Sequence, residues 1–212
     1  MLKLLIWDVD GVLVRASWEG IFEAYKALIK AEGKDYRSFF NNIDEMKKWW
    51  NTDWHENEKR IDIKDIEKSH KIFYDIASRY IHLLPWTENI LEKLLKKYKM
   101  AILTNRHSSS ALKQIGPVAK FFEVIIGAEH LEKLKPNSEG VRIILMETKI
   151  ARKDALMIGD MPADLIAGKT ADTKTGAVIW EYGLGTDEDF AKLDFKPDYI
   201  FRTPFDFLKQ LL

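Results

Sequence analysis

The chain has 212 residues, enough for one good-sized domain or for a core domain that carries a smaller insertion. Its 33 basic and 33 acidic residues balance, so no charge field favours nucleic acid or anionic lipid as a partner, and the absence of cysteine excludes disulfides, zinc-thiolate sites and a cysteine nucleophile. Apolar stretches are far shorter than the ~20 residues of a membrane helix, and no secretory cleavage site follows the first one, so we expect a soluble, cytoplasmic protein.

The first predicted element is a buried strand over Leu2–Trp7, which ends directly at Asp8. Because side chains alternate along a strand, Asp8 and Asp10 would point the same way, into the crevice beyond the strand's carboxyl end. Gly11 then allows a sharp turn and a close backbone approach. A hard divalent cation such as Mg²⁺ would relieve the repulsion between the two carboxylates. The alternative is a surface turn, for which Asp-x-Asp-Gly is good composition.

Residues 15–84 are predicted to form an all-helical block, because apolar residues recur there at three- and four-residue steps. Three stretches carry the pattern: Trp18, Ile21, Phe22, Tyr25, Leu28 and Ile29; Phe39, Phe40, Ile43, Met46, Trp49 and Trp50; and Ile66, Ile72, Phe73, Ile76, Tyr80 and Leu83. Gly33 closes the first helix and Pro85 ends the block. We expect the tryptophans Trp49, Trp50 and Trp54 to belong mainly to the core of this block, with Trp50 or Trp54 on its exposed side.

After Pro85, short apolar runs alternate with helical patterns. The predicted strands are 100–103, 124–126, 155–158, 177–180 and 199–201, and the predicted helices lie near 87–98, 108–120, 138–149, 163–171 and 204–211. Such alternation produces right-handed crossovers and a parallel sheet with helices on both faces. With the first strand included, residues 1–14 and 85–212 are predicted to form a Rossmann-like α/β core domain, and 15–84 an inserted helical cap domain.

Polar residues follow three further strands of this sheet, at the rim that Asp8 and Asp10 share. They are Thr104, Asn105, Lys135, Asp160 and Asp164. These groups suit phosphoryl transfer, because a metal and Lys135 can offset charge on the phosphate oxygens while a hydroxyl and backbone amides orient them. One carboxylate could attack phosphorus, and the other could protonate the leaving oxygen and then activate water.

Four motifs occur in order along the chain: Asp8-Val9-Asp10-Gly11-Val12-Leu13, Leu103-Thr104-Asn105, Lys135-Pro136, and Gly159-Asp160 with Asp164. Together they resemble the haloacid dehalogenase superfamily, in its phosphoglycolate-phosphatase-like branch with a helical cap. The resemblance covers the core, 1–14 and 85–212, and says much less about the cap. It implies an Mg²⁺-dependent hydrolase, and the presence of Asp10 argues for phosphate substrates, because the dehalogenases that attack carbon lack this second Asp.

The resemblance also implies a role for each residue that matches a motif. Asp8 would be the nucleophile that forms an aspartyl-phosphate, and Asp10 would be the general acid and base. Thr104 would hold the phosphoryl oxygens, assisted by the amide of Asn105. Lys135 would neutralise both the nucleophile and the transferring group.

A metal site is implied in the same way. Asp160 would bind Mg²⁺ together with Asp8 and the main-chain carbonyl of Asp10. Asp164 would support the lysine or a metal-bound water instead of binding the metal. Related sequences commonly have Ser or Thr after Gly-Asp, where this chain has Met161, so a hydroxyl that would tune the metal is missing.

Three further residues have two interpretations each. Arg15, at the expected hinge into the cap, is a substrate-binding candidate that could hold a carboxylate or phosphate bidentately, or it is a solvated linker charge. Arg106 and His107 follow the Thr-Asn motif and face the same rim, so either could touch substrate. Residues at the start of a helix are, however, more commonly part of the surface.

These features predict a phosphatase that cleaves a small phosphate monoester, phosphoglycolate-like or a sugar phosphate, through a phospho-aspartate. Closure of the cap about hinges near Val14-Arg15 and Leu84-Pro85 would exclude bulk water. The alternatives are a phosphosugar mutase of the same superfamily and a non-catalytic protein that binds phosphate or a partner. The expected partner is a small phosphorylated metabolite, with no nucleic acid or membrane, and the chain is expected to be a monomer or a homodimer.

Overall fold

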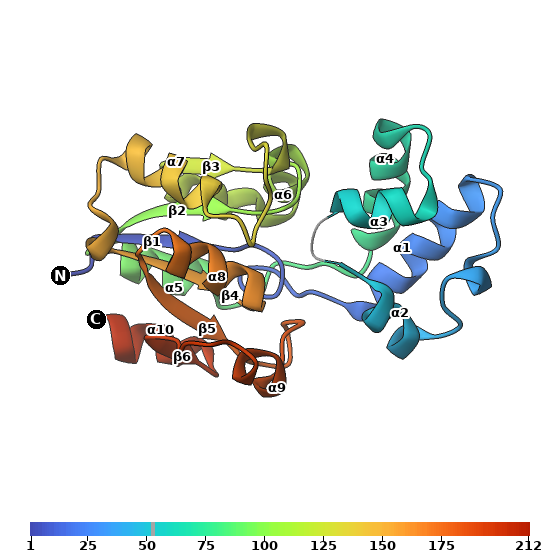
Figure 1. Cartoon of the computed structure of the whole chain (residues 1–212). Helices are drawn as coiled ribbons and strands as arrows, with labels where there is room; N and C mark the ends of the chain where they lie inside the picture. The colour runs from blue at the N-terminus through green and yellow to red at the C-terminus, as the bar shows by residue number, and fades with distance from the viewer. Residues whose placement is uncertain (52–53) are drawn as a thin grey trace. The chain divides into compact units, whose positions relative to one another are not determined.

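The computed structural model describes residues 1–51 and 54–212, with only the backbone of Trp54. Two compact units are present: an α/β unit of Met1–Arg15 with Leu83–Leu212, and a helical unit of Ala16–His82 (Figure 1). The helical unit is a single insertion between the first and second strands of the α/β unit. Within the described residues, no helix combines the length and the apolar character needed to cross a lipid bilayer.

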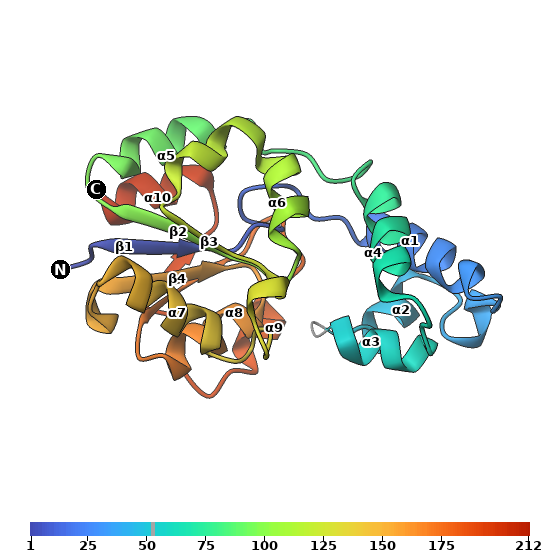
Figure 2. The ribbon, with the colours of Figure 1, turned by 90° about the horizontal axis from the view of Figure 1, so that it is seen from above.

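A parallel sheet of six strands, in the order β3-β2-β1-β4-β5-β6, forms the centre of the α/β unit as described. The strands are β1 (Leu4–Trp7), β2 (Lys99–Leu103), β3 (Val124–Ile126), β4 (Ala155–Gly159), β5 (Lys174–Val178) and β6 (Tyr199–Phe201). The helical segments are α5 (Thr87–Leu95), α6 (Ser108–Ile115), η2 (Gly116–Phe121), η3 (Ala128–His130), α7 (Glu139–Thr148), η4 (Arg152–Asp154), α8 (Pro162–Thr170), α9 (Asp187–Ala191) and α10 (Pro204–Leu211). In Figure 2, α5 and α10 lie on one face of the sheet and α7 and α8 on the other, which confirms the predicted Rossmann-like α/β fold.

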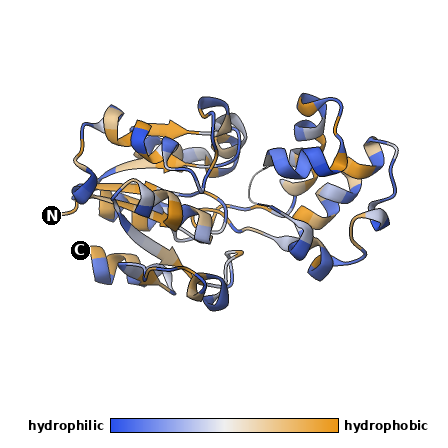
Figure 3. Cartoon of the chain, viewed as in Figure 1, coloured by the Kyte–Doolittle hydropathy of each residue, from blue (hydrophilic) through white to orange (hydrophobic). Residues whose placement is uncertain are grey.

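Apolar side chains on both faces of the central strands hold these layers together. All four residues of β1 are buried. Leu4 and Ile6 belong to a cluster that includes Val141 of α7, whereas the Trp7 ring contacts Phe207 of α10 with a centroid distance of 5.0 Å. A parallel strand covered on both faces needs such a continuous apolar run. Figure 3 shows hydrophobic residues concentrated in this sheet.

The strand order reverses between β1 and β4. From β1 the chain proceeds to β2 and β3 on one side and then returns to β4 on the other, so that Leu4–Trp7 pairs with both neighbours. Asp8 continues the pairing, and its N–H donates to the carbonyl of Ile158 at 2.9 Å. Doubly wound sheets bind their ligands in the crevice at this switch point. The residues that directly follow β1 and β4 are therefore placed at the expected ligand site.

Strand β5 lies three residues earlier than the apolar run predicted. It pairs with β4 through residues 174–177, whereas the sequence favoured 177–180. Thr175 is fully buried and its N–H donates to Oδ2 of Asp198 at 2.9 Å, while Gly176 leaves space for the ring of Phe201. A polar and a small residue thus belong to the sheet, and apolar periodicity alone does not find them. The short helix α9 was also not predicted, because it spans a single acidic turn and little more.

The helical unit consists of α1 (Trp18–Ala31), η1 (Tyr36–Ser38), α2 (Ile43–Trp49), α3 (Trp54–Ile61) and α4 (Ile66–Ala77) as far as it is described. Ser17, Asn42 and Asp65 cap α1, α2 and α4, because each side chain accepts a hydrogen bond from a backbone N–H of the first turn. Helix α3 was not predicted. Its sequence is mostly polar, and the side chains that it buries among the described residues are Asn57, Glu58 and Ile61.

Aromatic rings fill much of the helical unit's core. The ring of Tyr25 lies 5.2 Å from Phe73 and 5.3 Å from Trp49, and Phe40 lies 5.3 Å from Trp49, measured between ring centroids. Trp49 and Trp50 are half-buried and pack against this core, as predicted. The side chain of Trp54 lies outside the described residues.

Candidate active site

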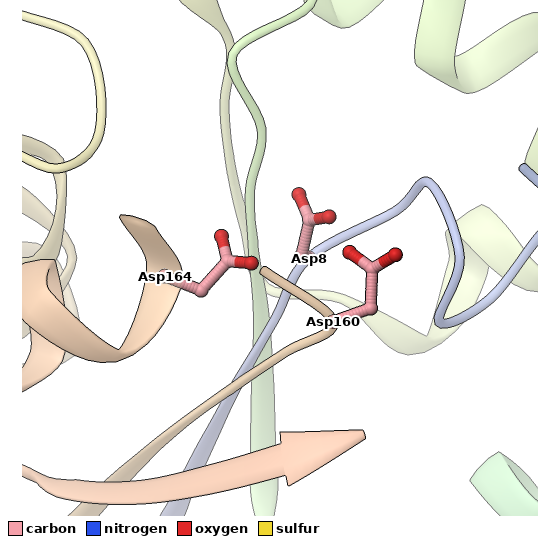
Figure 4. A group of neighbouring side chains, drawn as sticks. All are labelled: Asp8, Asp160 and Asp164. Atoms are coloured by element: carbon pink, nitrogen blue, oxygen red, sulfur yellow. The ribbon is translucent and has the colours of Figure 1, made fainter. Parts of the chain in front are cut away.

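Four charged side chains meet at the switch point of the sheet. Asp8 follows β1, Asp160 follows β4, Asp164 lies in the first turn of α8, and Lys135 comes from the loop between η3 and α7. One oxygen from each aspartate lies within 4.8 Å of the others, and Figure 4 shows the three carboxylates gathered around one space. All four side chains are buried. Buried charges are expensive unless paired or bound to a ligand, so this cluster is not a solvated surface patch.

Lys135 links two of the three aspartates. Its Nζ donates to Oδ1 of Asp8 at 2.6 Å, to Oδ1 of Asp164 at 2.5 Å and to the carbonyl of Leu103 at 3.1 Å. These bonds occupy all three N–H groups of the ammonium, whose side chain is only 5% exposed. Asn105 fixes the lysine backbone, because its amide donates to the Lys135 carbonyl at 3.0 Å and accepts from the Lys135 N–H at 2.9 Å. The second and third motifs are thereby joined.

Burial and crowding shift the protonation equilibria of the cluster. Burial, with contributions from Asp164 and Asp10, raises the pKa of Asp8 to about 7, although the Lys135 ammonium lowers it. Burial and then the neighbouring Asp8 and Asp164 hold the pKa of Asp160 well above its ordinary value. For Lys135, burial lowers the pKa, but the carboxylates of Asp164 and Asp8 raise it more, so the ammonium stays charged. Three carboxyl groups are therefore crowded together with a single ammonium, which contacts two of them, and a further positive charge would be stabilised there.

The carboxylate oxygens without hydrogen bonds suit a divalent cation. Across residues 1–51 and 54–212, no group donates to Oδ2 of Asp8 or to Oδ1 of Asp160. Both oxygens of Asp164 are occupied, Oδ1 by Lys135 and Oδ2 by the N–H of Met161 at 3.0 Å. Because hard cations such as Mg²⁺ prefer carboxylate oxygens, Asp8 and Asp160 fit as metal ligands, whereas Asp164 is engaged in holding the lysine and the start of α8.

The loop after β5 braces this edge of the sheet. The indole Nε1 of Trp180 donates to the carbonyl of Gly11 at 2.7 Å, and the N–H of Leu184 donates to Oδ2 of Asp160 at 2.7 Å. Gly11 has φ +74°, and a Cβ at this position would lie 2.0 Å from Oδ2 of Asp160. Only glycine accommodates both restrictions. Sequence reasoning missed Trp180 and Leu184, because the apolar run that contains Trp180 looks like part of a strand.

Thr104 lies at the carboxyl end of β2, directly after the carbonyl that accepts from Lys135. It is buried, its N–H donates to the carbonyl of Ile126 at 3.0 Å, and its Oγ1 accepts from the N–H of Arg106 at 3.1 Å. The hydroxyl keeps its own proton for donation. This arrangement is compatible with the predicted contact to a phosphoryl oxygen.

Asp10 is oriented by a neighbour that the sequence left ambiguous. The guanidinium of Arg106 donates from Nη1 to Oδ1 of Asp10 at 2.9 Å, and the Asp10 side chain is about a quarter exposed. Arg106 itself is buried. The only sequence signal for this pair is that Arg106 directly follows the Thr-Asn motif, since 96 positions separate the two residues.

Two further candidates lie at the surface of the α/β unit. Arg15 is exposed at the end of the unit's first segment, and none of the ion pairs found among described residues includes it. His107 lies with Nδ1 3.8 Å from Oε2 of Glu129, at the start of α6. The structure does not bring either residue into the buried cluster, so substrate contact by Arg15 stays a prediction.

Comparison with known proteins gives consistent matches over most of the chain. The family model described as haloacid dehalogenase-like hydrolase matches residues 5–178. Pyrophosphatase PpaX of Oceanobacillus iheyensis is 25% identical over 214 residues, which cover 94% of this chain and 92% of that protein. A haloacid dehalogenase-like family hydrolase from Streptococcus pneumoniae has a similar fold, with a TM-score of 0.73, 20% identity and coverage of 100% and 99%. A protein from Lactobacillus plantarum that is named as a phosphoglycolate phosphatase gives a TM-score of 0.77, with 20% identity and 99% coverage of both chains.

Proposed function

The chain belongs to the haloacid dehalogenase-like hydrolase family, and we propose that it is an Mg²⁺-dependent phosphatase that acts on a small phosphate monoester through an aspartyl-phosphate on Asp8. The observation that carries this proposal is the state of the Asp8 carboxylate. One oxygen is held by Lys135 at 2.6 Å, while the other accepts no hydrogen bond within the described structure and lies at the switch point of the sheet. A carboxylate fixed on one side and open on the other is suited to attack phosphorus.

Charge on the transferring phosphoryl group would be balanced by residues already in place. Lys135 contacts Asp8 directly, so its ammonium lies beside the position where the new oxygen–phosphorus bond forms. The Thr104 hydroxyl would donate to a phosphoryl oxygen. Asp164 keeps the lysine oriented through its 2.5 Å bond, and Asn105 keeps the lysine backbone in position.

A resident Mg²⁺ would be held by Asp8, Asp160 and the main-chain carbonyl of Asp10. When bound, it would offset negative charge on the carboxylates and on the phosphate oxygens. Asp160 is prepared for this role, because Leu184 holds one of its oxygens at 2.7 Å and leaves the other open.

Asp10 would serve as acid and then as base. In the first half-reaction it would give a proton to the leaving oxygen, and in the second it would take a proton from the water that attacks the phospho-aspartate. The helical unit would act as a cap that limits the access of bulk water, with hinges near Val14-Arg15 and Leu84-Pro85. Arg15, at one of these hinges, would contact an anionic group of the substrate.

We place the reaction in the cytoplasm, with a small phosphorylated metabolite as substrate and the chain as a monomer or homodimer. A phosphate-release assay tests the proposal, using phosphoglycolate, several sugar phosphates and a nucleotide monophosphate, each with and without Mg²⁺. Pyrophosphate belongs in the panel because a relative is named a pyrophosphatase. We expect metal-dependent release that falls by at least about 10³-fold in Asp8→Asn.

Asp172→Asn is the matched control, because Asp172 pairs with Arg152 at 2.8 Å on the exposed surface, and we expect it to leave the rate unchanged. Release that survives Asp8→Asn would contradict the proposed nucleophile. Interconversion of sugar phosphate isomers without net release would indicate the mutase instead, and no turnover of any compound would indicate a non-catalytic phosphate binder.

A further inference from the structure

Arg106 is a buried cation whose partners form a small network at the edge of the site. Its Nη1 donates to Oδ1 of Asp10 at 2.9 Å and to Oε1 of Gln114 at 2.6 Å, and its Nη2 donates to Oγ of Ser110 at 2.8 Å. The side chain is 7% exposed. A buried guanidinium carries a large desolvation cost, which an anionic partner has to offset. For Arg106 that partner is Asp10, so the role of Arg106 is sought in its effect on Asp10.

The network holds Arg106 from both ends. Ser110 and Gln114 lie four positions apart on α6 and therefore on the same face of that helix. At the backbone, the Arg106 N–H donates to Oγ1 of Thr104 at 3.1 Å and its carbonyl accepts from the N–H of Ala128 at 2.8 Å. The guanidinium is thus a fixed donor and not a mobile surface charge.

We propose that Arg106 is a positioning residue that orients the Asp10 carboxyl group for proton transfer during phosphate-ester hydrolysis. The inference rests on the proposed function. Because Arg106 donates to Oδ1 of Asp10, Oδ2 is the oxygen through which Asp10 would give and take the proton. Both Nη1 hydrogens are already used, by Asp10 and Gln114, so the guanidinium acts through Asp10 and does not grip the substrate with that nitrogen.

The proton balance of each half-reaction gives Arg106 a second effect. In the first, a carboxylate oxygen of Asp8 bonds to phosphorus, the bond from phosphorus to the leaving oxygen breaks, and that oxygen takes its electron pair and the Oδ2 proton of Asp10. Asp10 becomes an anion beside a fixed guanidinium, which stabilises the charge as it develops. In the second, water bonds to phosphorus, its proton returns to Asp10, and the bond between phosphorus and Asp8 breaks to release phosphate.

Leaving groups of different basicity separate this role from a structural one. A p-nitrophenolate leaves without much protonation, whereas an alkoxide needs a proton as its bond to phosphorus breaks. We expect Arg106→Gln to lower kcat/KM, which reports the first half-reaction, by about 10- to 100-fold for the turned-over substrate with the most basic leaving group, and by less than about threefold for p-nitrophenyl phosphate. Arg106→Lys, which keeps the charge, should recover part of the loss, and Arg142→Gln, a change at an exposed residue of α7, should leave both rates unchanged.

The double variant Asp10→Asn with Arg106→Gln gives an independent check. If Arg106 works through Asp10, its substitution has no further effect once Asp10 cannot transfer a proton. An equal loss of kcat/KM on both substrates, a change in KM alone, or additive losses in the double variant would overturn the positioning role while leaving the phosphatase intact. Release that persists in Asp8→Asn would overturn the proposed function itself, and this inference with it.

Discussion

The two units of the chain bury polar groups in different ways. In the α/β unit, Lys135 joins Asp8 and Asp164 across 127 and 29 positions of sequence, at the end of an otherwise apolar sheet. In the helical unit, the buried Glu58 accepts from His70, only 12 positions away, and the rest of the described core consists of aliphatic and aromatic side chains. Charges gathered from distant segments and left with open oxygens do not serve stability alone. The contrast supports the proposal that the reacting groups belong to the α/β unit, while the described core of the helical unit serves packing.

Substituting one paired lysine in each unit gives the test of this contrast with the largest expected effect. Lys135→Met leaves the Asp8 and Asp164 carboxylates without their cation, so we expect the free energy of unfolding to fall by about 3–5 kcal/mol and phosphate release to fall by 10²- to 10³-fold. Lys26→Met is the counterpart in the helical unit, where the lysine pairs with Glu23 at 2.8 Å and is 30% exposed. Its loss should be below about 0.5 kcal/mol. Denaturant unfolding and the phosphate-release assay are applied to both variants. Equal losses of stability and activity in Lys135→Met and Lys26→Met would contradict the difference between the two units.

A substitution in the core of the helical unit tests how much its aromatic packing contributes to stability. Phe40 is buried and its ring contacts Phe22, Tyr36 and Trp49. Phe40→Ala should lower the free energy of unfolding of the helical unit by about 3–5 kcal/mol, because it leaves a cavity among rings. Hydrogen exchange should increase over residues 16–82 and stay unchanged in β1 and β4. Increased exchange in the central strands would show that the two units unfold together.

Two glycines with nearly the same backbone angle sharpen the comparison further. Gly11 has φ +74° and Gly33 has φ +73°, but a Cβ on Gly11 would collide with Asp160 whereas a Cβ on Gly33 meets nothing within 4 Å. Gly33→Ala should cost only the backbone strain of about 1–2 kcal/mol. Gly11→Ala should lower the free energy of unfolding by more than this, because the new Cβ collides with Asp160. It should also lower phosphate release by more than tenfold, because it displaces a proposed metal ligand. Similar activities of the two variants would contradict the close packing at Gly11.

The smallest expected effect isolates one hydrogen bond inside the α/β unit. Trp180 and Trp86 lie 6.0 Å apart between ring centroids. Nε1 of Trp180 donates to Gly11, whereas Nε1 of Trp86 is buried and has no hydrogen-bond partner among the described residues. Trp180→Phe removes this hydrogen bond, so we expect a loss of about 1 kcal/mol in stabilisation of the site, which corresponds to a roughly fivefold lower kcat. Trp86→Phe removes the same ring volume but no hydrogen bond, so it should leave kcat unchanged. Matching losses would show that only ring packing matters.

The sequence predicts the α/β sheet well because its central strands are buried on both faces and most strands coincide with short apolar runs. Asp8 and Asp160 were found because each directly follows a strand, Asp164 because it begins the next helix, and Lys135 because it lies with Pro136 in the loop after a strand. Their roles stay predictions. The misplaced β5 and the missed α3 depend on tertiary packing, through a buried Thr175 and a helix with few apolar residues.

The contacts that brace the site carry no local signal. Arg106 meets Asp10 across 96 positions, and Trp180 meets Gly11 across 169. No periodicity or spacing connects such residues, since the connection depends on the strand order, which brings loops after β1, β2 and β5 to one edge. The pairs therefore become visible only when the chain is folded.

The bridge between Val14 and Leu83 has an evolutionary consequence. These residues pair antiparallel, and the N–H of Leu84 donates to the carbonyl of Leu13 at 3.1 Å, so the insertion leaves and rejoins its host at one point. Because closing a longer loop adds only logarithmically to the entropy cost of folding, this junction tolerates inserts of very different length. The helical unit can accordingly be exchanged, shortened or replaced as a module without rebuilding the sheet that carries the proposed active site.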